Sequence, residues 1–142
     1  MSPILRLAER VVTSSPWIWS RLYYPHLYQG GKPADFQQYL ATMRASLRQP
    51  GRMAALRGVA TGQEQCRARV PELRCPVLIV MGTKDPDFPD PAAAARDGAA
   101  VIGRYTDVSL ELIEGAGHYP HAELAEQSAL AVLPFLAQVA DG

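Results

Sequence analysis

The sequence predicts an α/β fold organised around a β-α-β unit with parallel strands. Residues 77–81 form a continuous apolar run between Pro76 and Gly82, which is typical of a strand buried on both faces. Residues 108–113 carry a second strand pattern, and residues 91–102 between the two carry a helical pattern. Because a helical crossover of this kind joins parallel strands, we expect both strands to run in the same direction.

Two titratable side chains follow the two predicted strands. Asp85 comes just after the first strand and His118 just after the second, and the loops after parallel strands open on the same edge of a sheet. Gly115 and Gly117 allow a short loop to aim the imidazole back over the sheet. A carboxylate that accepts a hydrogen bond from an imidazole fixes its tautomer and stabilises its protonated form. A lone histidine in a turn is more often structural, but the paired Asp85 favours a catalytic role for His118.

Three aspartates share the loop after the first strand, so the acid that pairs with the histidine has a rival. Asp85 is the first acid after the strand and is our choice, whereas Asp87 lies only two residues further along. Asp90, just before Pro91, is expected to cap the following helix. A calcium loop starting at Asp85 would need glycine where Asp90 stands and glutamate where Arg96 stands. We therefore predict neither a metal site nor a cofactor.

The residues around these two loops resemble a known family. Pro-Val-Leu-Ile-Val-Met-Gly-Thr-Lys-Asp (76–85) and Glu-Gly-Ala-Gly-His-Tyr-Pro-His (114–121) are similar to the closing strands and triad loops of the α/β-hydrolase family. The resemblance implies a C-terminal fragment of that fold: a helical cap with a connector over residues 1–74, then a β-α-β-α part of the core over residues 75–142. It also implies esterase-like acyl hydrolysis by Ser-His-Asp chemistry, with His118 as the base and Asp85 as the residue that orients it. The substrate would be a small apolar ester or a related compound, of unspecified identity.

The nucleophile of such a site is missing from the chain. None of the serines has a glycine two positions to either side, no aspartate stands in an equivalent frame, and no His-Gly oxyanion segment occurs. The resemblance therefore implies a hydrolase that lacks its first half and is inactive alone, through a truncated reading frame or a split enzyme completed by a partner. The alternative is a non-catalytic module that binds an apolar ligand or a partner.

Helical patterns dominate the first half of the chain. They cover residues 4–12, 17–24, 35–47, 53–60 and 64–73. Pro25 is expected to end or kink the second of these helices, and Asp35 to cap the third. A final helix should start at about residue 121 and be kinked at Pro134.

Aromatic side chains are concentrated in the same region. Seven of the eleven aromatic residues lie in the first 39 positions, and an aromatic helical layer before the triad loops resembles the lid of the family. Most of these rings would pack the helices together, and a minority would line an apolar acyl pocket. The candidates for that pocket are Trp17, Trp19, Tyr23, Phe36 and Tyr39.

Charge and composition restrict the partners. Residues 1–75 hold 11 Lys and Arg against 4 Asp and Glu, whereas residues 76–142 hold 3 against 10. We interpret this as two oppositely charged regions that lie against each other, and not as nucleic-acid binding, because no binding motif accompanies the arginines. No apolar run approaches the roughly 20 residues that span a bilayer, and charged residues interrupt the N-terminal segment. We expect a cytoplasmic protein that does not contact membranes, with Cys66 and Cys75 as free thiols.

A sheet of two parallel strands would be incomplete. Parallel strands normally lie inside larger sheets, so the strand over residues 77–81 would present an open apolar edge. We expect that edge to be covered by an N-terminal hydrolase half or by a second copy in a homo-oligomer.

Overall fold

The computed structural model describes residues 11–61 and 63–140, which form two compact units. One unit comprises the chain up to His26 together with Ala34–Arg67, and the other comprises Leu27–Pro33 together with the chain from Ala68 onward. The segment Leu27–Pro33 thus interrupts the first unit in sequence and belongs to the second. From the sequence, this segment was expected to belong to the cap region over residues 1–74.

The first unit is built from helices. Their bounds, with the helix that leads into the second unit, are α2 Pro16–Ile18, a π-helix Trp19–Tyr23, α3 Tyr24–His26, α4 Phe36–Leu47, α5 Arg52–Thr61 and α6 Gln63–Arg69. The 3-10 helix Val70–Glu72 then continues from α6 in the second unit. The helix predicted over residues 4–12 lies almost wholly outside the described residues.

One of the two local expectations for this unit, the Asp35 cap, needs correction. Asp35 precedes α4, but its backbone is outside the extended region usual for a capping residue and its side chain makes no capping hydrogen bond. The helix that contains Pro25 ends at His26, one residue after the proline. The turn before the proline is widened to a π-helix, in which the Tyr24 N–H bonds to the Trp19 carbonyl.

The core of this unit is small and aromatic. Tyr24, Phe36 and Leu40 are buried, and the Tyr24 and Phe36 rings stack with centroids 6.2 Å apart. Ser20 is fully buried, and its hydroxyl accepts a hydrogen bond of 2.8 Å from Nε of Arg44 on α4.

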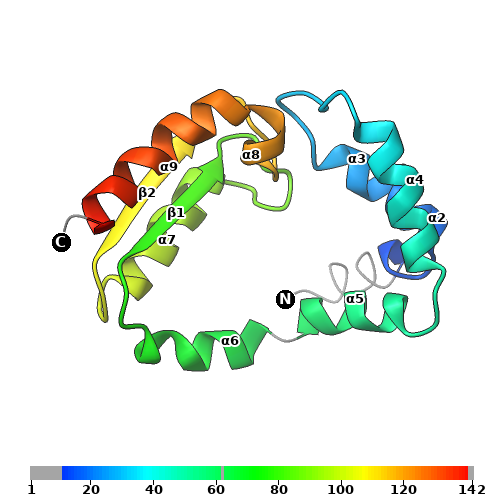
Figure 1. Ribbon diagram of the computed structural model, residues 1–142. Helices are drawn as coiled ribbons and strands as arrows, with labels where there is room; N and C mark the ends of the chain where they lie inside the picture. The colour runs from blue at the N-terminus through cyan, green and yellow to red at the C-terminus, as the bar shows by residue number, and fades with distance from the viewer. Residues whose placement is uncertain (1–10, 62, 141–142) are drawn as a thin grey trace. The chain divides into compact units, whose positions relative to one another are not determined.

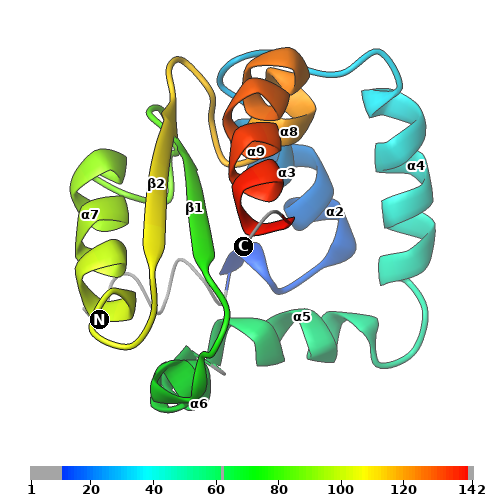
Figure 2. The same ribbon diagram turned by 60° about the vertical axis from the view of Figure 1, so that its left-hand side comes forward.

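The second unit contains the predicted parallel strand pair. Strand β1 (Val77–Gly82) pairs with β2 (Val108–Ile113) in register from Val77 opposite Val108 to Gly82 opposite Ile113. Helix α7 (Pro91–Ile102) covers one face of the pair, and α9 (Ala125–Ala140) covers the other (Figures 1 and 2). This arrangement confirms the α/β class and the parallel β-α-β unit.

The helices of this unit begin at recognisable signals. Asp90 caps α7 as predicted, because its carboxylate accepts a 2.8 Å hydrogen bond from the Ala93 N–H. The expected final helix is instead two helices, α8 (Pro120–Glu123) and α9, separated at Leu124. The break thus precedes Pro134, which lies inside α9. None of the helices in the described residues has both the length and the apolar character needed to cross a membrane.

Candidate active site

Asp85 lies in the tight turn that follows β1. Its backbone N–H donates to the Gly82 carbonyl at 3.2 Å, and its carboxylate Oδ1 accepts the Asp87 N–H at 3.0 Å. Only 4% of the residue is exposed. A buried carboxylate is costly unless hydrogen bonds compensate it, so these contacts stabilise the position of Asp85 at the edge of the sheet.

His118 follows β2 in a loop that packs closely on the turn after β1. Gly82 and Gly117 have no space for a Cβ atom: one at Gly82 would overlap the carbonyl of Gly117, and one at Gly117 would overlap the carbonyl of Leu27. Gly115 has a φ of 81°, which favours glycine. Gly115 therefore permits the turn before His118, and Gly117 permits the close approach of neighbouring backbone.

Two further hydrogen bonds connect the two loops. The hydroxyl of Thr83 accepts the Gly115 N–H at 2.9 Å, and the Lys84 N–H donates to the Ala116 carbonyl at 2.8 Å. Both contacts are independent of the Asp85 and His118 side chains, so the backbone itself brings the acidic loop and the histidine loop together.

The side chains of Asp85 and His118 form a direct pair. Oδ2 of Asp85 lies 2.8 Å from Nδ1 of His118, whereas Oδ2 of Asp87 lies 3.6 Å from the same nitrogen. Asp85 is also the more buried acid, with 3% of its side chain exposed against 30% for Asp87. Because a carboxylate only accepts, the Asp85 contact places the hydrogen on Nδ1 and leaves the lone pair on Nε2.

The His118 side chain is partly exposed. About a third of the His118 side chain (35%) is exposed, and its ring meets the Tyr119 ring edge-on, with centroids 4.9 Å apart. Within the described residues, no hydrogen bond engages Nε2. The arrangement therefore combines an acid-paired Nδ1 with an imidazole that is partly exposed.

Glu123, at the end of α8, contacts the backbone around His118. Its Oε1 accepts the Tyr119 N–H at 3.0 Å, and its Oε2 accepts the Gly117 N–H at 3.0 Å. The same Oε2 accepts the N–H groups of Gln29 at 2.8 Å and Gly30 at 2.5 Å. Nothing in the spacing of Glu123 in the sequence indicates contacts with residues 29–30.

The acid–imidazole cluster also has the composition of a metal site. Asp85, Asp87 and His118 each offer one ligand atom, and these atoms lie within 4.8 Å of one another. Coordination through Nδ1 would require the lone pair that the Asp85 hydrogen bond excludes, so the acid–imidazole pair and an ion bound at Nδ1 are alternatives.

The five candidates for an acyl pocket all belong to the first unit and differ in exposure. Phe36 is buried, Trp19 and Tyr23 are half-buried with ring centroids 4.9 Å apart, and Trp17 and Tyr39 are 59% and 52% exposed. Their assignment to a substrate pocket stays a prediction.

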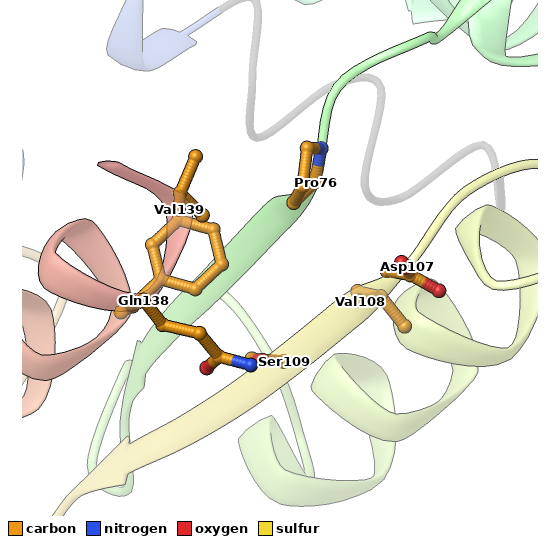
Figure 3. A pocket seen from close by; sticks show the side chains of 7 residues that line it. Pro76, Asp107, Val108, Ser109, Gln138 and Val139 are labelled. Carbon is orange, nitrogen blue, oxygen red and sulfur yellow. The ribbon is translucent and has the colours of Figure 1, made fainter. Parts of the chain in front are cut away.

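A pocket of the second unit lies at the amino ends of the strands, away from Asp85 and His118. It has a volume of about 380 Å³ and lies beside the start of both strands and the last turns of α9 (Figure 3). Its lining residues are Pro76, Asp107, Val108, Ser109, Phe135, Gln138 and Val139. Since the acid–imidazole pair lies at the carboxyl ends of the same strands, this pocket is not part of the candidate active site.

Comparison with known proteins identifies the class. A model of the alpha/beta hydrolase family matches residues 1–131. Because the match covers most of the chain, this protein belongs to the alpha/beta hydrolase family, as its two loop segments suggested. No curated protein and no solved structure gives a significant match.

Proposed function

We propose that this chain supplies the acid–base part of an esterase-like hydrolytic site. The observation that carries the proposal is the 2.8 Å contact between Oδ2 of the buried Asp85 and Nδ1 of His118. His118 acts as general base through Nε2, and Asp85 holds its tautomer and stabilises the imidazolium that forms. The substrate class is a small apolar ester or a related acyl compound.

The reaction requires a nucleophile that these residues do not contain. In the proposed mechanism a serine hydroxyl transfers its proton to Nε2 of His118 as its oxygen attacks the acyl carbon, and the same proton later passes to the leaving alcohol. Backbone N–H groups near that serine stabilise the oxyanion. We assign both parts to a hydrolase half that lies outside the 142 residues and also covers the open edge of β1.

We predict no His118-dependent ester hydrolysis by the purified 142-residue protein. The motivating fact is the absence of a Gly-x-Ser-x-Gly sequence. Hydrolysis of 4-nitrophenyl butyrate should proceed at the same rate with the wild type and with His118→Ala. Turnover that His118→Ala abolishes would show that the chain contains its own nucleophile, and would refute the assignment to an outside half.

A chimera tests the positive side of the proposal. The first half of an active esterase of the family, joined to this chain, should hydrolyse the ester, and His118→Ala should slow it by about 10²–10⁴-fold because the general base is lost. His121→Ala is the matched control: it removes an exposed imidazole three residues further on and should leave the rate unchanged. Equal rates for His118→Ala and the parent chimera would contradict a catalytic role for His118 and favour a non-catalytic binding module.

A further inference from the structure

The backbone on both sides of His118 is held by one carboxylate. The N–H groups of Gly117 and Tyr119 both donate to Glu123, at 3.0 Å each, and the His118 N–H between them donates to the Leu27 carbonyl at 2.8 Å. Three consecutive N–H groups are therefore engaged at the residue that carries the imidazole. These three hydrogen bonds restrict the backbone of His118, and with it the direction of its Cα–Cβ bond.

Glu123 also holds the segment that provides the middle contact. Its Oε2 accepts the N–H groups of Gln29 and Gly30, which follow Leu27 by two and three residues. Leu27 is almost fully buried, with 2% exposed. Glu123 thus accepts hydrogen bonds both from the loop that carries His118 and from the segment whose Leu27 carbonyl accepts the His118 N–H.

Only an ionised carboxylate satisfies this arrangement. Four N–H groups converge on the two oxygens, three on Oε2 and one on Oε1. A glutamine would turn one of these acceptors into an NH₂ donor facing N–H groups, and a protonated carboxyl would have the same defect. Hydrogen bonds to an ionised acceptor are also shorter and stronger than neutral ones.

We propose that Glu123 is the positioning residue for His118: it fixes the loop and the Leu27–Gly30 segment so that Nδ1 stays within hydrogen-bonding distance of Asp85. This role rests on the proposed function, because it concerns the orientation of the proposed base. Correct orientation of His118 then requires Glu123 as well as Asp85.

The test uses NMR spectroscopy on the full 142-residue protein and its Glu123→Gln variant. In the variant, the Gly117 and Tyr119 amides should exchange about tenfold faster or more, as expected for the loss of charge-assisted hydrogen bonds. The His118 Nδ1–H signal should weaken or move upfield as the contact with Asp85 loosens. Glu126→Gln, which makes the same change on an exposed side chain in the first turn of α9, should alter neither signal.

The outcomes separate the positioning role from a structural role and from the function itself. Faster amide exchange with an unchanged His118 Nδ1–H signal, or no change in either, overturns the positioning role. Absence of the Nδ1–H signal in the wild type contradicts the proposed function instead, while the amide exchange still reports on the Glu123 contacts. If Glu123→Gln does not fold, Glu123→Asp decides by the same two measurements, since it keeps the charge but is too short to reach all four N–H groups.

Discussion

Asp85 and Asp87 both lie near the His118 imidazole, but they differ in burial and in their distance from its Nδ1 atom. Asp85 is buried and contacts Nδ1 at 2.8 Å, whereas Asp87 is 30% exposed and 3.6 Å away. Asp87 also supports its neighbour, because its N–H donates to Oδ1 of Asp85. A backbone donor survives a side-chain substitution, so the two acids can be separated by experiment.

Asp85→Asn and Asp87→Asn should therefore differ strongly. In Asp85→Asn the amide no longer selects the Nδ1–H tautomer, so the His118 Nδ1–H signal should disappear. The hydrolysis rate of the chimera should fall by about 10²–10⁴-fold, no further than in His118→Ala, because Asp85 acts only through His118. Asp87→Asn should keep the signal and lower the rate by about fivefold or less, the scale of a partly exposed ion pair. Proton NMR spectra and ester hydrolysis by the two variants check this, and the reverse order of effects would make Asp87 the acid.

At the scale of single residues, the sequence predicted the features that depend on nearby residues in the chain, and not those that depend on tertiary contacts. The pairing of Asp85 with His118 could be predicted because each lies in the loop that follows a strand pattern. The contacts of Glu123 could not be predicted, because they depend on residues 29–30 lying beside residues 117–119, and that is a tertiary contact. The sequence could not decide between Asp85 and Asp87 either, since the direction of each side chain in an irregular loop depends on the folded structure.

The elements that were predicted best are those with strong patterns of their own. Strand β2 and helix α7 have the predicted bounds, and β1 is one residue longer, ending at Gly82. The division between α8 and α9 was missed, because Leu124 is neither glycine nor proline and gives no local signal for a break.

Two glycines should respond in opposite ways to alanine. Gly82→Ala should lower the free energy of unfolding by about 1–3 kcal/mol, because the new Cβ would overlap the backbone carbonyls of Ala116 and Gly117. Gly98→Ala, inside α7, should raise it by about 0.5–1 kcal/mol, since its Cβ would meet Ile79 at an ordinary distance of 3.8 Å. Urea unfolding of the two variants measures both changes. Equal stability of Gly82→Ala and the wild type would mean that the two loops do not pack as closely as described.

At the scale of the whole molecule, the notable feature is a parallel sheet of two strands with both faces covered. Within the described residues β1 pairs with β2 alone. The Val77 N–H donates to the Asp107 carbonyl and the Thr83 N–H to the Ile113 carbonyl. Because N–H directions alternate along a strand, those of Leu78 and Val80 point to the other edge. An unpaired edge on an apolar strand favours association with another strand.

Hydrogen exchange of β1 tests whether that edge is open. In the purified protein at low concentration, the Leu78 and Val80 amides should exchange about tenfold faster or more than those of Ile79 and Met81, which point toward β2. In the chimera the four amides should become similarly slow, because the added half supplies the missing neighbour. Equal protection of all four in the purified protein at every concentration would contradict an open edge. Protection that rises with concentration would instead identify a second copy of the chain as the partner, because only self-association depends on concentration in this way.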